Sequence, residues 1–159
     1  MKLTRAHIRS IIREEVVEMS GLYKRQPGAG IVVVRQFEDG WRVLCLHTED
    51  FMDLPKGGID PGEDEITTAL RETSEEAHIT DLHFEWGFEA MQISHVTMFV
   101  ASTTQDPKVL PNPTTGELEH LGSSWLTWEE AHTSIKPWLS PCIPWARKKI
   151  NDSNSNLGI

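Results

Sequence analysis

Apolar residues along the chain recur first at strand-like and then at helix-like spacing. Residues 31–37 and 41–47 are rich in apolar and β-branched side chains, and the Asp-Gly pair at 39–40 between them is typical of a hairpin. The spacing becomes helical over residues 63–77. One face of that helix collects its apolar side chains, Ile66, Leu70 and Ala77. We therefore expect a β-hairpin followed by a helix that packs this face on a core.

The rest of the chain continues the mixture of strands and helices. Further strands are expected at residues 83–92, 95–103 and 118–126, with a loop at 106–116 and a linker at 26–30. Thr127 is placed to cap a short helix, and a last helix is expected over residues 140–150. Strands interleaved with helices predict an α/β fold with a mixed sheet between helical layers.

The N-terminal residues form an amphipathic unit of their own. Their apolar side chains recur at helical spacing and predict a helix over residues 4–19, with Thr4 as its N-cap. We therefore expect an N-terminal helix (1–20), a main domain (21–150) and a flexible tail (151–159). The helix is expected to pack on the domain or on a second copy of the chain, which would make a homodimer.

Three glutamates of the 63–77 helix carry the first chemical signal. Glu72, Glu75 and Glu76 are spaced i, i+3, i+4, which places them on one face. Like charges at this spacing destabilise a bare helix. The face is either a solvated acidic surface or a site for a divalent cation, which takes oxygen ligands.

The loop before this helix favours the cation site. Gly57 and Gly58 permit a ligand to approach the backbone closely, and Lys56 supplies a cation at the loop entrance. Proline and further glycine in the same stretch are typical of a turn-rich loop.

Residues 57–79 resemble the Nudix box, whose pattern is G-x5-E-x7-R-E-U-x-E-E-x-G-U, with U a bulky apolar residue. The charged positions of the pattern are all matched, by Glu63, Arg71, Glu72, Glu75 and Glu76. Thr73 departs at a bulky apolar position, and His78 replaces the last glycine. His78 stands where the helix would end in the left-handed region, which histidine tolerates better than most residues.

The resemblance implies a Nudix-type α/β/α sandwich and metal-dependent hydrolysis. It implies that Mg²⁺ or Mn²⁺ is held by Glu72, Glu75 and Glu76, while Arg71 pairs with a glutamate and is structural. A metal-bound water would be the nucleophile, and the cation would screen the phosphate charges. The substrate-binding residues would be Lys56, Gly57 and Gly58.

A second segment is similar to the asymmetric diadenosine tetraphosphate hydrolases of the Nudix family. It reads Glu119-His120, then four residues, then Trp125. The similarity implies that Glu119 is a further metal ligand or the general base, with Glu117 as the alternative. Those hydrolases stack adenine on tyrosines, whereas this chain has one tyrosine. Phe51, Trp86 or Phe88 are the candidates for stacking a base, unless they belong to the core.

The leading functional hypothesis is a pyrophosphohydrolase acting on a nucleoside diphosphate linked to another group, with dinucleoside polyphosphates first. The alternatives are removal of pyrophosphate or a cap from RNA 5′ ends, hydrolysis of ADP-ribose, and hydrolysis of nucleoside triphosphates. A non-catalytic nucleotide-binding module is the alternative from another class. The intact box glutamates argue against it, because a binding module has no need for mutually repelling acids.

Composition narrows the function classes. The formal net charge of −9 argues against a protein that holds long nucleic acid through its phosphates. No apolar run approaches a membrane span, and the N-terminus lacks the apolar core of a secretory signal. Cys45 lies in a strand pattern and is expected as a buried, reduced thiol. These features favour a cytoplasmic protein without a membrane partner.

Overall fold

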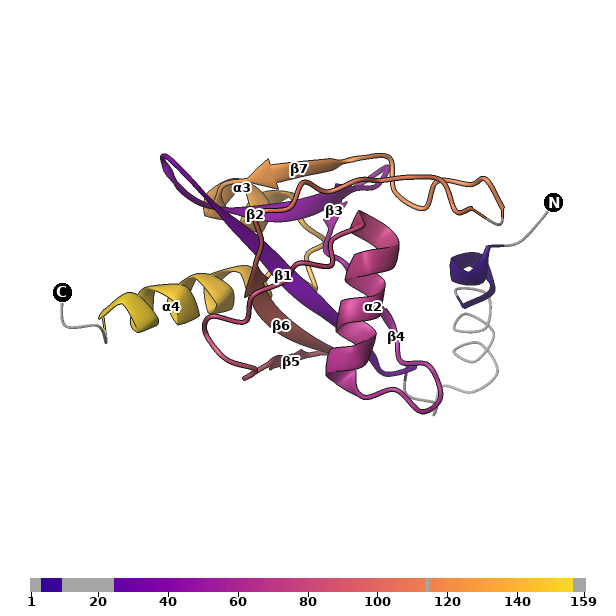
Figure 1. The fold of residues 1–159 in the computed structure, drawn as a ribbon, viewed down its shortest axis with the longest axis horizontal. Coiled ribbons are helices and arrows are strands. Elements are labelled where there is room, and N and C mark those ends of the chain that lie inside the picture. Colours follow the sequence, from indigo (N-terminus) through magenta and orange to yellow (C-terminus); the bar gives the residue numbers. More distant parts are fainter. Residues whose placement is uncertain (1–3, 10–24, 114, 156–159) are drawn as a thin grey trace.

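The computed structural model describes residues 4–9, 25–113 and 115–155. Its centre is one seven-stranded mixed sheet in which β1 and β6 are parallel neighbours and all other pairs are antiparallel (Figure 1). The path β3-β2-β1-β6-β5 forms the sheet, β4 also pairs with β1, and β7 also pairs with β2. The strands are β1 (Gly28–Phe37), β2 (Gly40–His47), β3 (Met52–Asp53), β4 (Lys56–Gly58), β5 (Met91–Ile93), β6 (Val96–Ser102) and β7 (Ser123–Leu126).

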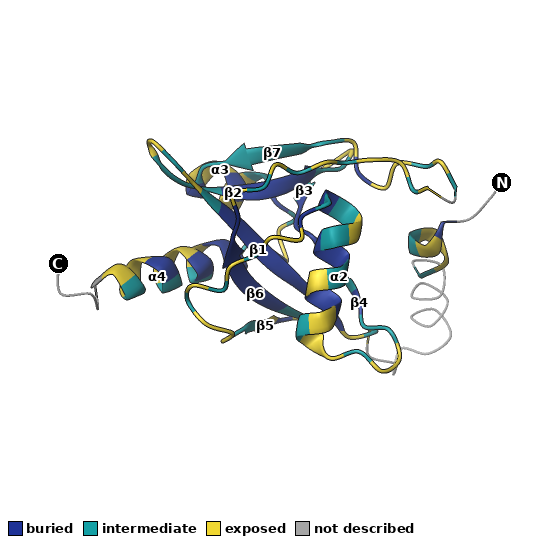
Figure 2. Cartoon of the chain, viewed as in Figure 1, coloured by how far each residue is buried: buried dark blue, intermediate teal, exposed yellow. Residues whose placement is uncertain are grey.

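Helices cover both faces of this sheet, which confirms the predicted α/β sandwich. Helix α2 (Glu65–Ala77) lies on one face, and α3 (Trp128–Ser134) and α4 (Cys142–Ser155) lie on the other (Figure 1). Alternate residues of β1 point to opposite faces, so each face contributes to its own core. The core under α2 includes Ala29, Ile31, Val33, Leu44 and Leu46, and that under α3 and α4 includes Val32, Val34, Val43 and Cys45. Figure 2 shows these central strands as the buried part of the chain.

The predicted hairpin is confirmed, but three strand boundaries were wrong. Strands β1 and β2 pair from Val34↔Val43 to Phe37↔Gly40. The supposed linker at 26–30 is wrong for residues 28–30, which begin β1 and pair with both β4 and β6. Gly30 makes this pairing possible, because a Cβ there would collide with the backbone of Pro55. The strands predicted at 83–92 and 118–126 are limited to β5 and β7.

The helix predictions are confirmed in part. Thr127 caps α3 in a capping box with Glu130. Helix α4 continues to Ser155, so residues 151–155 are helical rather than frayed. At the other end residues 5–9 are helical, and the His7 N–H donates to Thr4 Oγ1 at 2.8 Å, as expected of an N-cap. The remainder of the helix predicted at 4–19 lies outside the described residues.

The predicted buried face of α2 is confirmed in part: Ala77 is buried and Ile66 packs against the core, but Leu70 does not. Leu70 is 39% exposed, whereas Glu72 is 3% exposed. The buried residues are mostly small: Thr68, Ala69, Thr73 and Ala77. Small side chains let the helix approach the sheet closely. The helix is therefore rotated about its axis so that its small residues face the sheet, and Glu72, on the same face, is buried with them.

Both cysteines are free and buried, as expected for Cys45. Burial raises the pKa of each thiol to about 12, so neither is a reactive thiolate. Among the described helices, none has the length and apolar character needed to cross a bilayer.

Candidate active site

The start and the end of α2 are both fixed by polar contacts. The Asp64 side chain accepts a hydrogen bond from the Thr67 N–H at the N-terminus. His78 ends the helix in the left-handed region at φ 55°, and its N–H donates to the Ser74 carbonyl. This confirms the expectation that histidine takes the place of glycine in the C-terminal turn.

Arg71 ties the loop before α2 to the helix. Its Nε lies 2.8 Å from Glu63 Oε2, and its Nη2 donates to the Gly58 carbonyl at 3.0 Å. Its Nη1 donates to Glu72 Oε1 at 2.9 Å. The hydrogen bond from Arg71 lowers the pKa of Glu63 to about 2, so this carboxylate stays ionised. These contacts agree with the structural role expected for Arg71.

Glu72 lies against the backbone of β4. A Cβ at Gly57 would collide with the Glu72 carboxylate, so any other residue there would displace this carboxylate. Burial raises the pKa of Glu72, although Arg71 and Arg9 offset part of this effect. The contact between β4 and α2 thus pairs Gly57, which has no side chain, with the buried carboxylate of Glu72.

The other two box glutamates take different positions. Glu76 is partly buried and its Oε2 accepts the Lys56 N–H at 3.2 Å. Desolvation, followed by the charge of Glu72, raises the pKa of Glu76 well above its ordinary value. Glu75 is exposed and turns to Arg71, 3.3 Å away. Within the described ranges, no three His, Cys, Asp or Glu side chains are arranged as a preformed metal site.

These residues open on a cleft of about 780 Å³. Its walls come from α2, from the start of β4, from the N-terminal turn and from the loop that precedes β7. Lys56, Gly57, Glu76 and Glu119 all line it. Glu117, the alternative to Glu119, instead lies 3.1 Å from His7 Nδ1. The predicted site residues are therefore gathered around one cavity, with Gly58 buried in β4 beside it.

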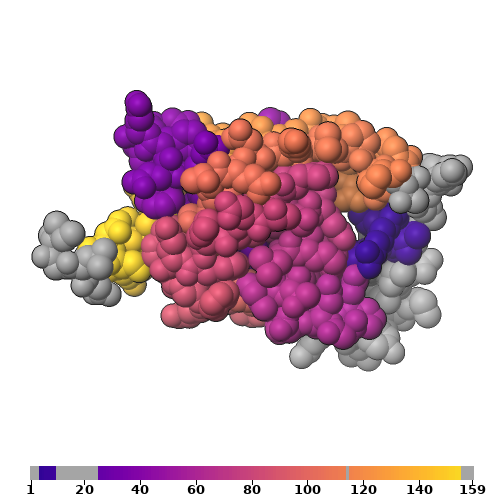
Figure 3. Space-filling view, in the orientation of Figure 1, coloured from indigo at the N-terminus to yellow at the C-terminus, as the bar shows by residue number. Residues whose placement is uncertain are grey.

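The N-terminal turn adds cations to the acidic cluster. Arg9 Nη1 lies 2.6 Å from Glu72 Oε1, and Arg9 Nη2 lies 3.0 Å from Asp60 Oδ1. Arg5 contacts Asp60 at 2.5 Å. Figure 3 shows the turn (indigo) beside the box segment (magenta) and the loop near residue 115 (orange). Arg9 was not among the predicted site residues, because sequence spacing does not reveal a partner 63 residues away.

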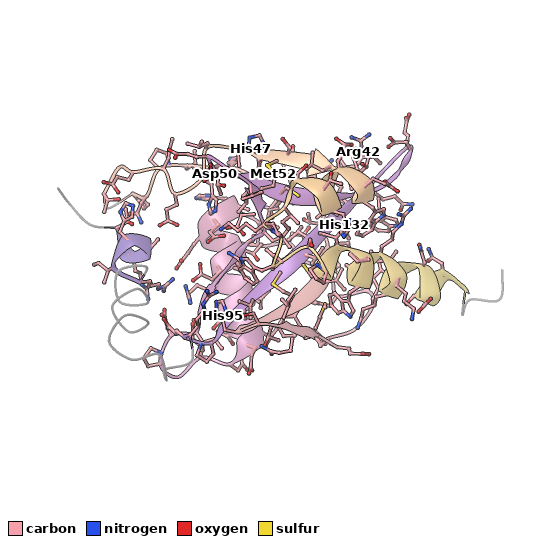
Figure 4. All side chains as sticks on the ribbon, turned by 180° about the vertical axis from the view of Figure 1, so that it is seen from behind. Arg42, His47, Asp50, Met52, His95 and His132 are labelled. Carbon is pink, nitrogen blue, oxygen red and sulfur yellow. The ribbon has the colours of Figure 1, made fainter. Side chains whose placement is uncertain are left out.

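None of the three expected base-stacking residues lines the cleft. Phe88 stacks on Phe84, Trp86 packs on Trp41, and Phe51 is exposed. A different aromatic pair lies beside Lys56. Trp138 and His95 are stacked with ring centroids 5.6 Å apart, and Lys56 Nζ lies 5.8 Å from the Trp138 ring. His95 is labelled in Figure 4. Since these two residues come from distant segments, sequence spacing could not pair them.

Comparison with known proteins agrees with this arrangement. The family profile described as the NUDIX domain matches residues 23–146. An asymmetrical bis(5′-nucleosyl)-tetraphosphatase of Caenorhabditis elegans is 33% identical over 120 residues, which cover 68% of this chain and 81% of the relative.

Solved structures of Nudix hydrolases are also similar to this chain. The crystal structure of a C. elegans Ap4A hydrolase binary complex has a TM-score of 0.58 and 25% identity, covering 83% of this chain and 99% of that one. The Nudix hydrolase RenU from M. smegmatis has a TM-score of 0.59 at 15% identity, covering 82% and 90% of the two chains, and supports the fold alone. The chain therefore belongs to the Nudix family, as a hydrolase of pyrophosphate bonds that is similar to the asymmetrical Ap4A hydrolases.

Proposed function

We propose that the protein is a Mg²⁺-dependent pyrophosphohydrolase of dinucleoside polyphosphates, of the diadenosine tetraphosphate type. The observation that carries this proposal is the pairing of two desolvated glutamates, Glu72 and Glu76, with Gly57 and Lys56 at one cleft. The asymmetrical tetraphosphatase relative supports the substrate class.

The donor chemistry at the cleft fits a hard divalent cation. Glu72 and Glu76 offer carboxylate oxygens. Burial and, after it, repulsion by Glu72 raise the pKa of Glu76, and a bound cation would favour the ionised form instead. We assign Glu72 and Glu76 as the main metal ligands, with Glu75 and Glu119 joining from the rim. Glu75 would have to leave Arg71 to do so. The bound cation would acidify a water molecule and screen the phosphate charges.

The remaining side chains have separable roles in this proposal. Lys56 would bind a substrate phosphate, since its ammonium lies at the cleft. Glu119 would accept the proton of the attacking water, and Glu117 is less suited because it faces His7. Gly57 lines the cleft, so its backbone would contact the substrate, whereas Gly58 is buried in β4 and would support this strand from behind.

The stacked pair of His95 and Trp138 supports a nucleoside as part of the substrate. An aromatic face beside a phosphate-binding lysine suits a base whose phosphate lies a few ångströms away. We propose that this pair replaces the tyrosines that the resemblance led us to look for.

A substrate panel tests the proposal. Purified protein with Mg²⁺ is offered diadenosine tetraphosphate, triphosphorylated RNA, ADP-ribose and nucleoside triphosphates. We expect the highest kcat/KM for diadenosine tetraphosphate. A preference for RNA ends or ADP-ribose would contradict the substrate class, and no turnover of any compound would favour a binding module.

A variant pair separates the two candidate bases. Glu119→Gln should lower kcat by roughly 100-fold, within the usual range for general base catalysis, whereas Glu117→Gln should stay within a fewfold of the wild type. A larger fall in kcat for Glu117→Gln than for Glu119→Gln would assign the general base to Glu117.

A further inference from the structure

Asp53 is a buried carboxylate held by lysines from two parts of the chain. It lies in β3 with a side chain that is 7% exposed. Lys56 Nζ lies 3.0 Å from its Oδ1, and Lys136 Nζ lies 2.9 Å from its Oδ2. Burial alone would raise the pKa of Asp53, but His120 and the two lysines more than offset it and hold the pKa well below its ordinary value. The cluster is therefore a charged one.

The loop between α3 and α4 brings Lys136 to this position. The Lys136 N–H donates to the Met52 carbonyl at 3.1 Å, and Ile135 forms an isolated bridge with Met52. Trp138, in the same loop, lies under the Lys56 ammonium. Met52 is labelled in Figure 4, beside its register partner His47. The loop is thus tied to β3 by backbone and side chain together.

Two ammonium groups, those of Lys56 and Lys136, share the single carboxylate of Asp53. The next acid is Glu76, whose Oε2 accepts the Lys56 backbone N–H. Both Nζ atoms contact the same Oδ2, at 3.2 Å and 2.9 Å, so the two ammoniums are close neighbours. Each has three N–H donors, of which a carboxylate contact uses only part. The side chain of Lys136 is 33% exposed and keeps access to a ligand.

Lys56 lines the cleft, and Lys136 lies next to it through the shared Asp53 Oδ2. From this geometry we propose that Lys136 is a second phosphate-binding residue at the edge of the cleft, and that Asp53 positions it together with Lys56. The proposal deepens the proposed function, on which it rests for the polyphosphate nature of the ligand. Two adjacent cations suit a chain of phosphates better than one, since each contacts its own anionic oxygen. The Nudix box contains neither Asp53 nor Lys136.

Binding of methylenediphosphonate tests the role of Lys136. Its P–C–P link resists hydrolysis, so calorimetry with Mg²⁺ measures affinity without turnover. Lys136→Met should weaken this affinity about tenfold, because the variant loses one charge-assisted contact to the phosphonate. The matched control is Lys149→Met, because Lys149 also has an aromatic contact, with Trp145, but pairs with Glu89 on another part of the fold. Equal affinity of Lys136→Met and the wild type, or no binding by the wild type, would overturn the proposal.

Steady-state kinetics with diadenosine tetraphosphate provide a second measurement. Lys136→Met should raise KM about tenfold and change kcat less than about threefold, because a phosphate contact in the ground state persists in the transition state. A fall in kcat alone would contradict a binding role. If the wild type cleaves no compound of the panel while methylenediphosphonate binding still depends on Lys136, the proposed function fails and the binding residue stands.

A double-mutant cycle tests the positioning role of Asp53. In the Asp53→Asn background, Lys136 has lost its anchor, so adding Lys136→Met should cost much less than tenfold in affinity. The same tenfold loss in both backgrounds would show that Asp53 does not position Lys136. Should Asp53→Asn fail to fold, the single Lys136→Met variant still decides whether Lys136 binds phosphate.

Discussion

Glu76 combines a partly buried position with a raised pKa. Because the pKa is higher in the folded chain than its ordinary value of 4.5, the folded state binds the proton more tightly. The stability that this provides is present at low pH and is lost as the pH rises through the folded pKa. Without metal, the ionised form of Glu76 therefore opposes folding relative to its protonated form.

We predict that Glu76→Gln unfolds at a higher temperature than the wild type at pH 7 in the presence of a chelator. The amide keeps an acceptor for the Lys56 N–H and removes the charge, which should stabilise by about 1 kcal/mol or more. Added Mg²⁺ should then stabilise the wild type but not the variant. Thermal denaturation measures both effects.

Glu65→Gln is the matched control, since Glu65 is an exposed acid in the same helix. It should respond to Mg²⁺ as the wild type does. A Glu76→Gln variant that is destabilised without metal, or that still responds to Mg²⁺, would contradict the assignment.

Glu63 shows the opposite pKa shift. Its pKa is lowered from 4.5 to about 2 by Arg71, so its ionised form stabilises the folded state above pH 4.5, and the effect disappears as the pH falls toward 2. The stability advantage of the wild type over Glu63→Gln should be constant between pH 6 and pH 8 and shrink below about pH 4.5. Urea titrations at each pH measure it. An advantage that grows on acidification would contradict this ion pair.

At the scale of single residues, the sequence predicted that three acids share one helix face but not how each is held. The spacing of Glu72, Glu75 and Glu76 indicated one face, yet Glu75 is exposed and Glu72 is buried. That difference depends on the rotation of α2 about its axis, which the small residues decide. Lys136 could not be predicted at all, because only tertiary pairing brings it to Asp53.

The contact between β4 and α2 is the element-scale feature on which the site depends. Gly57→Ala should displace the Glu72 carboxylate, because the added Cβ would occupy its place. A displacement of this kind should lower kcat on the order of 100-fold. Gly122→Ala is the control, as a Cβ there meets only His47 at 3.8 Å. If both variants keep wild-type kcat, Gly57 is not needed for the placement of Glu72.

The N-terminal turn is the second element that bears on the site. Arg9 places its guanidinium beside Glu72. This positive charge repels a metal ion that approaches the Glu72 carboxylate. Arg9→Ala should therefore bind Mn²⁺ roughly three- to tenfold more tightly at low salt, as measured by calorimetry. Arg35→Ala, which breaks a contact with Asp106 elsewhere, should leave Mn²⁺ affinity unchanged. Weaker Mn²⁺ binding by Arg9→Ala would mean that Arg9 supports the metal ligands instead.

Among the elements, the strongly patterned ones were predictable. The hairpin and the capped helices follow from turn chemistry and periodicity, which act locally. Strands β3 and β4 were missed because a strand of two or three residues shows no periodicity in the sequence. These strands are defined only by their pairing, of β4 with β1 and of β3 with β2. The linker predicted at 26–30 was wrong for residues 28–30 for the same reason, since Gly28 and Gly30 lie in a crowded part of the sheet rather than in a loop.

At the scale of the whole molecule, the mixed sheet brings distant segments to one cleft. Strand β1 pairs with β4, which carries Lys56 and Gly57, and β2 pairs with β7, which follows Glu119. The order of the strands thus places the box glutamates opposite the segment that carries the candidate base. This convergence is what connects the fold to phosphoanhydride hydrolysis.

The most direct measurement follows the cleavage of diadenosine tetraphosphate by wild type and Glu76→Gln with Mg²⁺, using chromatography of the nucleotide products. We expect ATP and AMP in equal amounts from the wild type, no products after chelation, and a rate at least about 100-fold lower for the variant. Two ADP molecules as products would contradict the asymmetrical cleavage. A Glu76→Gln variant as active as the wild type would contradict the central claim that the glutamates of this cleft hold the catalytic metal.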